Sequence, residues 1–152
     1  MIWGSFIWGK RGPLVILPKG HLNGRKYVDI LEEHLLDFWM EQSEERGYVI
    51  FQEDISPVYT CKFAKQWRES MDIESLEWPP NSPDLNLIEH VWYILKISIK
   101  KMAVRPRTVP DLVKAIQKAW NEIDEDILNK LVESLPNRLA DVIKVKGGNT
   151  KY

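Results

Sequence analysis

Cysteine is almost absent from the sequence, with Cys61 as the single example among 152 residues. One cysteine cannot form a disulfide within the chain and cannot supply a cluster of thiolates for zinc. We therefore expect a reducing, intracellular setting. Long apolar runs are absent too, because no stretch approaches the roughly 20 residues of a membrane-spanning helix. No membrane partner is expected, and the opening residues MIWGSFIWGKRG lack the pattern of a signal peptide.

The sequence also lacks an excess of charge, with 21 Lys and Arg residues against 22 Asp and Glu residues. A net charge of −1 creates no overall field that attracts nucleic acid, so any such binding requires a local patch. Tryptophan, in contrast, is abundant, with seven residues. Hydrophobic residues make up 44% and charged residues 28%, which is typical of one soluble globular domain with a real core.

Hydrophobic periodicity predicts an α/β chain. Strands are expected over 2–8, 12–18, 48–54 and 73–78, with a turn at Gly9–Pro13 between the first two. Helices are expected over 24–42 after an Asn23 cap, from Ser56-Pro57 onward, and over 86–102, 109–123, 125–135 and 137–144. In the second helix, Phe63, Ala64, Trp67 and Met71 should lie on one face. This order predicts a three-layer α/β fold followed by helices only.

Two acids fall where α/β sheets place their sites, beyond the carboxyl ends of strands. Asp54 ends the predicted strand 48–54, and Glu89 lies in the first turn of the predicted helix 86–102. If the two carboxylates converge, they could bind a hard cation such as Mg²⁺. Other roles remain open at this point. Asp54 could cap the following helix, and Asn86 with Glu89 fits a capping box.

A basic strip accompanies the second acid. At helical spacing, Glu89, Tyr93, Lys96 and Lys100 share one stripe, and Ile88, Val91, Leu95 and Met102 share another that we assign to the core. Between Trp92 and Pro110 there is no acid, and the basic residues are Lys96, Lys100, Lys101, Arg105 and Arg107. Such a strip suits a polyanion held near a metal ion. A merely solvated helix face is the alternative.

Several segments together resemble the catalytic domain of mariner-superfamily DNA transposases, the group that includes the Tc-one-like elements. WPPNSPDLNLIEHVW, residues 78–92, is similar to the family's W-P-x-x-S-P-D-L-N-x-I-E-x-x-W signature. FQEDISPVYT, residues 51–60, resembles its F-x-x-D-N-x-P-x-H-T segment. WGSFIWGKRGPLVIL and VIKVKGGNTKY resemble the family's flanking segments. The 34-residue gap between the acids is also that of a major branch of the family.

The resemblance implies a ribonuclease H-like fold, two Mg²⁺ or Mn²⁺ ions among three carboxylates, and cut-and-paste transposition of DNA in the nucleus. Asp54 and Glu89 match the family's second and third catalytic, metal-binding carboxylates. The motif would form a rigid turn that aims Glu89 at the metals, shaped and anchored by Trp78, Pro79, Ser82, Pro83, Asp84, Asn86 and Trp92. DNA, both transposon end and target, would be the partner, bound by the basic strip.

This chain departs from the family's pattern at several positions. The family's first carboxylate and its helix-turn-helix region lie upstream of the WGSF-like segment, where the sequence has only Met1 and Ile2. Ile55 and Tyr59 stand where the family usually has Asn and His, and Leu87 replaces a frequent Pro. We therefore expect a ribonuclease H-like fold that lacks its central first strand, with two strand edges unpaired.

The expected organisation is a partial catalytic domain over 1–104, a helical extension over 105–144 and a flexible tail over 145–152. One hypothesis is a transposase fragment that is inactive alone because two carboxylates neutralise less of a dimetal centre than three. The alternative is a non-catalytic remnant that binds DNA, or that dimerises with an intact transposase and modulates it. A ribonuclease H-like nuclease of other purpose is a third hypothesis, which the closing KGGNTKY segment argues against.

Overall fold

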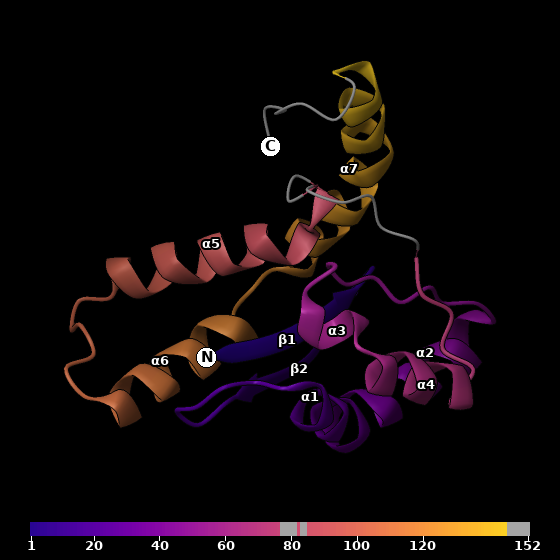
Figure 1. The fold of residues 1–152 in the computed structure, drawn as a ribbon. Helices are drawn as coiled ribbons and strands as arrows, with labels where there is room; N and C mark the ends of the chain where they lie inside the picture. Colours follow the sequence, from indigo (N-terminus) through magenta and orange to yellow (C-terminus); the bar gives the residue numbers. More distant parts are fainter. Residues whose placement is uncertain (77–81, 83–84, 146–152) are drawn as a thin grey trace. The chain divides into compact units, whose positions relative to one another are not determined.

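The computed structural model describes residues 1–76, 82 and 85–145. Figure 1 labels its helices and strands along the chain. Contacts between residues divide the chain into two compact units. The first unit contains Met1 and residues 17–82, and the second contains residues 2–16 and 83–152. Among the described residues, no helix is long and apolar enough to cross a membrane.

A helical run from residue 24 to residue 46 forms the largest part of the first unit. It consists of α1 (Gly24–Ile30), a π-helical turn η1 (Leu31–Leu35) and α2 (Leu36–Arg46). The Asn23 side chain accepts from the Lys26 N–H at 3.0 Å, which confirms the predicted cap. The helix extends beyond the predicted end at residue 42 and stops at Gly47, whose φ of 73° suits glycine.

One face of the helical run stays buried on both sides of the π turn. Tyr27, Ile30, Leu31 and Leu35 are buried, and Phe38 and Trp39, farther along the same helical stripe, are half-buried. Beyond the turn, Gln42 is buried at 1% exposure whereas Met40 is 61% exposed. Gln42 lies seven residues after Leu35, on the same face of the helix, so the 3.6-residue period still marks the buried face beyond the π turn.

Two shorter helices follow in this unit, α3 (Pro57–Thr60) and α4 (Lys62–Ser70). Ser56 occupies the N-cap of α3 and Pro57 its first turn, as predicted. On the predicted apolar face, Ala64 and Trp67 are buried, but Phe63 and Met71 are 43% and 40% exposed, so only part of that face is buried. The Arg25 guanidinium lies 5.6 Å from the centre of the Phe63 ring, which gives this aromatic side chain a surface partner.

The strands predicted over 48–54 and 73–78 are reduced, in the described residues, to one parallel bridge between Phe51 and Ser75. The Phe51 N–H donates to the Glu74 carbonyl and the Leu76 N–H donates to the Phe51 carbonyl, both at 2.8 Å. Ile50 and Leu76 beside the bridge are 42% and 39% exposed. Strand pairing depends on contacts with the neighbouring segment as well as on the apolar pattern, so in the described residues the pattern overestimated the strands.

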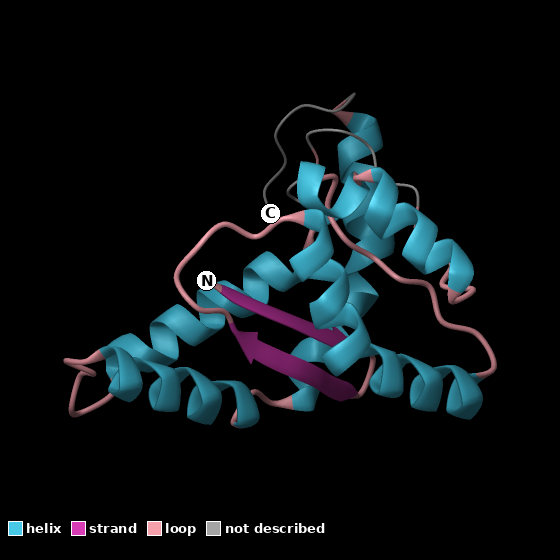
Figure 2. Ribbon diagram, turned by 60° about the horizontal axis from the view of Figure 1, so that its bottom comes forward, coloured by secondary structure: helices cyan, strands magenta, loops and turns pink. Residues whose placement is uncertain are grey.

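The second unit is built on a hairpin of β1 (Ile2–Ile7) and β2 (Lys10–Ile16), drawn in magenta in Figure 2. The predicted turn at Gly9–Pro13 is wrong, because Trp8 and Gly9 alone form it and the strand resumes at Lys10. Gly9 has a φ of 73°, as tight hairpin turns require. Pro13 fits within β2 because Ser5 faces both Gly12 and Pro13 where the register shifts, and such a bulge needs no N–H from proline.

Three helices pack on this hairpin and on one another: α5 (Leu87–Lys101), α6 (Val109–Asn121) and α7 (Glu125–Lys144). Their buried cluster includes Val91, Leu95, Ala119, Trp120, Ile123, Leu128 and Leu131. The helices predicted over 125–135 and 137–144 are in fact one helix that continues through Pro136. One side-chain bond spans the proline, since Arg138 Nε donates to Ser134 Oγ at 2.8 Å. Ser134 Oγ in turn donates to the Leu131 carbonyl in the preceding turn.

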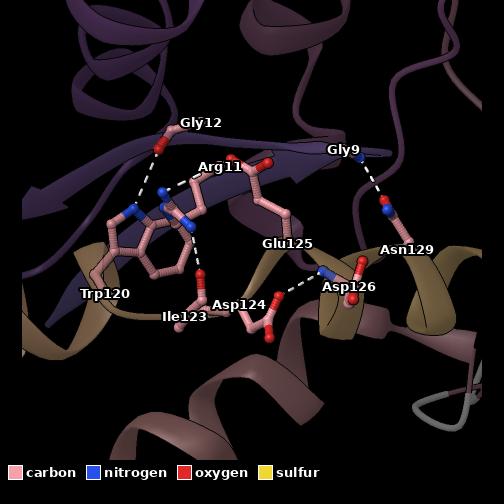
Figure 3. Close-up of polar contacts among 9 residues, drawn as sticks. All are labelled: Gly9, Arg11, Gly12, Trp120, Ile123, Asp124, Glu125, Asp126 and Asn129. Carbon is pink, nitrogen blue, oxygen red and sulfur yellow. Dashed lines mark hydrogen bonds and ion pairs between the residues drawn. The ribbon is translucent and has the colours of Figure 1, made fainter.

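Polar bonds attach the hairpin to α6 and α7 (Figure 3). Trp120 Nε1 donates to the Gly12 carbonyl at 3.2 Å, which gives the bulge a partner for this backbone oxygen. The Arg11 guanidinium donates to the Ile123 carbonyl and lies 3.7 Å from Glu125. The Gly9 N–H donates to Asn129 Oδ1 at 2.5 Å. The unit that contains Glu89 is therefore fixed both by apolar packing and by these bonds.

Candidate functional site

Asp54 lies in the five-residue segment between the Phe51 bridge and α3. Its side chain is half-buried, and its Oδ1 accepts from the Ser56 N–H at 2.8 Å. This is a bond to a residue two positions on, typical of an Asx turn. Ser56 is itself the N-cap residue of α3, and the Asp54 side chain bonds to its N–H instead of to a first-turn amide. The helix-cap alternative for Asp54 is therefore not formed.

Glu53, the neighbour that sequence reasoning passed over, is the more enclosed of the two acids. Its carboxylate oxygen Oε1 lies 2.6 Å from Arg68 Nη1, and the side chains of Glu53 and Arg68 are 14% and 8% exposed. Tyr27 donates its hydroxyl proton to the other oxygen, Oε2. Burial raises the pKa of Glu53 to about 7, although the Tyr27 hydrogen bond and Arg68 act in the opposite direction.

Tyr27 and Tyr59 complete this cluster. Burial, together with the Glu53 carboxylate, raises the pKa of the Tyr27 hydroxyl well above its ordinary value, so Tyr27 stays a proton donor. The rings of Tyr27 and Tyr59 have centroids 4.4 Å apart. Arg68 Nη2 donates to the Tyr59 carbonyl at 3.2 Å. One signal of the cluster was available in the sequence: Arg68 lies four residues after Ala64, on the buried face of α4, where a cation requires an acidic partner.

Glu89 lies in the first turn of α5 and is exposed, as predicted from the helical stripe. Its N–H bonds to the Asn86 carbonyl at 3.2 Å. Asn86 is the N-cap residue, but its side chain makes no capping hydrogen bond, so that half of the capping-box alternative is not formed. A carboxylate here lies at the positive end of the helix dipole.

The two predicted ligands belong to different units, Asp54 to the first and Glu89 to the second. In the described part of the chain, no group of three or more His, Cys, Asp or Glu side chains is arranged to hold a metal ion. The donor chemistry nevertheless fits Mg²⁺ or Mn²⁺, because both residues offer carboxylate oxygens. The metal-binding roles of Asp54 and Glu89 stay predictions.

The predicted basic strip lies at the surface of the second unit. Lys96, Lys100 and Lys101 are exposed on α5, and Arg105 and Arg107 are exposed in the segment between α5 and α6. Tyr93, one turn after Glu89 on the same stripe, is 60% exposed. Val91 and Leu95 are fully or nearly fully buried, which confirms the orientation of the helix. Whether the strip binds nucleic acid stays a prediction.

The remaining motif residues divide into two groups. Trp78, Pro79, Pro83 and Asp84 lie outside the described residues. Ser82 is half-buried, and Asn86 precedes α5. Trp92 is half-buried and packs beside the core cluster of the second unit, with its ring centroid 5.8 Å from that of Trp120. Trp92 therefore fixes α5 one turn beyond Glu89.

Comparison with known proteins gives one family and a set of relatives. The profile of the family described as DDE superfamily endonuclease matches residues 19–113. The chain is 36% identical over its full length to the Tcb1 transposase of Caenorhabditis briggsae, and 32% identical to the Tc1 transposase of Caenorhabditis elegans. It covers 54% of each, so it spans about half the length of these curated relatives.

Solved structures give the fold. The catalytic domain of Mos1 transposase with Raltegravir and Mn superposes with a TM-score of 0.86 at 18% identity, covering 99% of this chain and 76% of that one. The Mos1 mariner paired-end complex with Mn superposes with a TM-score of 0.74 at 20% identity, covering 91% of this chain and 40% of that one. The ribonuclease H-like fold expected from the sequence is confirmed by the first of these matches.

Proposed function

Because the chain belongs to the DDE superfamily of endonucleases, we propose that it supplies two acidic ligands of a metal-dependent DNA transposase site. The reaction would be strand cleavage at transposon ends followed by strand transfer and integration. The observation that carries the proposal is the state of the two motif acids. Asp54 is half-buried beside a helix start and Glu89 is exposed at another, and in the described contacts neither forms an ion pair.

The proposed cofactor is Mg²⁺ or Mn²⁺, which also accompany solved structures of the Mos1 catalytic domain. When bound between carboxylates, such ions supply an activated oxygen nucleophile and stabilise the leaving oxygen of a phosphate ester. Asp54 and Glu89 would hold them. The Asx turn fixes Asp54 through one oxygen, and the packing of Trp92 and Val91 fixes the first turn of α5.

The proposed substrate is DNA, bound by Lys96, Lys100, Lys101, Arg105 and Arg107. All five are exposed, and the stretch between Trp92 and Pro110 contains no acid that would neutralise them locally. Contacts of this kind are made to phosphates, so they position DNA without reading its sequence. DNA integration of this type would take place in the nucleus.

A site of three carboxylates needs a further acid beyond Asp54 and Glu89. Asp29 and Asp37, on the long helical run, are exposed and belong to no ligand cluster in the described residues. We therefore expect this chain alone to be inactive in strand cleavage. The exposed basic strip supports the second candidate function, DNA binding or modulation of an intact transposase without catalysis.

Thermal unfolding followed by tryptophan fluorescence, with and without millimolar Mn²⁺, tests the metal site. A ligand that binds only the folded chain raises the midpoint. We expect a higher midpoint with Mn²⁺ in the parent chain and a smaller shift in Asp54→Asn or Glu89→Gln. Glu125→Gln, an exposed acid at the start of α7, is the matched control and should respond like the parent. An equal shift in all four proteins would refute specific metal binding.

A second assay addresses catalysis. The chain is mixed with the N-terminal half of a Tc1-type relative and with 3′-end-labelled transposon-end DNA. Cleavage should require both halves, Mn²⁺ and both acids. Cleavage by the chain alone would contradict the expected inactivity. Cleavage by the mixture that survives Asp54→Asn or Glu89→Gln would contradict the proposed ligands.

A further inference from the structure

The position of Asp54 depends on a segment without regular structure. Residues 52–56 connect the Phe51 bridge to α3 and belong to neither a helix nor a strand. In the described contacts, the hydrogen bond of Asp54 is local, to the Ser56 N–H. A local bond sets the shape of the turn but does not attach it to the rest of the unit. Some other residue must fix where the Asp54 carboxylate lies.

Glu53 makes that attachment. Its Oε1 is paired with Arg68 on α4 at 2.6 Å, and its Oε2 accepts from the Tyr27 hydroxyl on α1. Arg68 Nη2 also donates to the Tyr59 carbonyl on α3 at 3.2 Å. One side chain therefore joins the segment to helices on both sides of it in the sequence. Since the Glu53 and Arg68 side chains are 14% and 8% exposed, water competes little for these bonds.

We infer that Glu53 is a positioning residue, which, through Arg68 and Tyr27, holds the backbone so that the Asp54 carboxylate is presented for a metal ion. The inference rests on the proposed function for the role of Asp54, but the positioning itself is a property of this chain's contacts. Carboxylate ligands held by such outer bonds keep a defined orientation, and loss of those bonds weakens metal affinity.

The same contacts separate the roles of the two adjacent acids. Both oxygens of Glu53 are engaged with Arg68 and Tyr27, so Glu53 is committed to the interior of the unit. Asp54 uses Oδ1 for the turn, and the described contacts show no ion pair for it. The pair of acids in the sequence QED thus contains one anchor and one candidate ligand. Exchanging them, as in Glu53→Asp with Asp54→Glu, should disrupt both roles.

Amide hydrogen exchange measured by NMR tests the inference without metal. The probe is the Ser56 N–H, which donates to Asp54 Oδ1. The internal control is the Phe51 N–H, which donates to the Glu74 carbonyl at 2.8 Å just before the segment. In Glu53→Gln we expect the Ser56 amide to exchange at least about tenfold faster, the effect of losing one charge-assisted bond. Phe51 should change by less than about threefold.

Three further variants sharpen the result. Tyr27→Phe removes one of the two bonds to Glu53 and should give an intermediate effect. Glu53→Met with Arg68→Met replaces the ion pair by apolar groups, which can preserve stability while losing the directional contacts. In this double variant the Phe51 amide should stay protected from exchange, whereas the Ser56 amide should exchange faster than in the parent. Glu122→Gln, which breaks the exposed Lys118–Glu122 pair in the second unit, should change neither amide.

The outcomes are distinct. Selective acceleration of Ser56 in the Glu53 variants supports positioning. Unchanged Ser56 exchange overturns it, and equal acceleration of Ser56 and Phe51 also overturns it, because that result indicates a merely structural loss.

Line broadening by Mn²⁺ then tests the proposed function separately. We expect broadening centred on residues 53–56 in the parent and at least about tenfold weaker Mn²⁺ binding in Glu53→Gln. No broadening in the parent would refute the metal role of Asp54 while leaving the exchange result to decide the positioning. Parent-like Mn²⁺ affinity in Glu53→Gln would overturn the presentation of Asp54 by Glu53.

Discussion

Trp92 on α5 packs against Trp120 on α6 with ring centroids 5.8 Å apart and planes inclined by 30°. Both rings meet β1 at Gly4, where a Cβ atom would lie 2.9 Å from Trp92 Cη2 and 3.3 Å from Trp120 Cη2. Leu14 Cδ1 would also be 3.3 Å away. The strand therefore approaches two stacked tryptophans at the one position that has no side chain.

Gly4→Ala should destabilise the second unit for this reason. The added methyl group must displace a packed indole, and overpacking of this kind costs about 1–3 kcal/mol. Chemical denaturation followed by fluorescence measures the change. Combining Gly4→Ala with Trp92→Phe provides the control, because the smaller ring leaves room for the methyl group. If Gly4→Ala costs as much in the Trp92→Phe background as in the parent, the steric explanation is wrong.

Pro136→Ala should stabilise α7. The helix continues through Pro136, which is exposed and has no N–H to donate to the preceding turn. Alanine restores that donor and has the best helix propensity, so we expect a gain of about 1 kcal/mol or more in unfolding free energy. Circular dichroism during denaturation gives the measurement. A loss of stability would mean that the Ser134 and Arg138 side-chain bonds depend on the proline geometry.

Local signals predicted much of the helical part correctly. The Asn23 cap, the Ser56-Pro57 helix start and the orientation of α5 each depend on neighbours within a few residues, so sequence alone contains them. The wrong prediction of a helix break at Pro136 also came from a local signal. As a local signal this proline indicates a helix end, whereas packing of the flanking turns and the Arg138–Ser134 bond keep α7 continuous.

The features that could not be predicted depend on contacts between distant segments. The apolar pattern of 48–54 is compatible with a full strand, but only Phe51 and Ser75 form a bridge in the described residues. Likewise, the sequence around the adjacent acids Glu53 and Asp54 does not show which of them turns toward the interior. That choice follows from Arg68 and Tyr27, which reach Glu53 from helices that are distant in sequence.

Glu53 should make the stability of the first unit depend on pH. Burial raises the pKa of Glu53 from an ordinary 4.5 to about 7, so the folded chain holds this proton more tightly than the unfolded chain. The contribution of Glu53 to the free energy of unfolding is fully present below about pH 4.5 and is lost as the pH rises through about 7. The full loss is on the order of 3 kcal/mol. Unfolding free energies of the parent and Glu53→Gln, measured between pH 4.5 and 8, isolate this contribution. The parent should lose stability relative to the variant as pH rises, and a constant difference between them would contradict the raised pKa.

The basic strip should make DNA binding depend on salt. Lys96 and Lys100 are exposed one turn apart on α5. Loss of two lysine–phosphate contacts reduces the magnitude of the slope of log affinity against log salt concentration by about 1–2. We expect Lys96→Ala with Lys100→Ala to weaken binding and flatten that slope in fluorescence anisotropy with duplex DNA. Lys114→Ala with Lys130→Ala removes the same charge from exposed positions on α6 and α7 and is the matched control. Because both double variants have the same net charge, a difference between them reports the location of the contact. Equal weakening by the two would indicate a general charge effect, and would remove the strip as the DNA-binding surface.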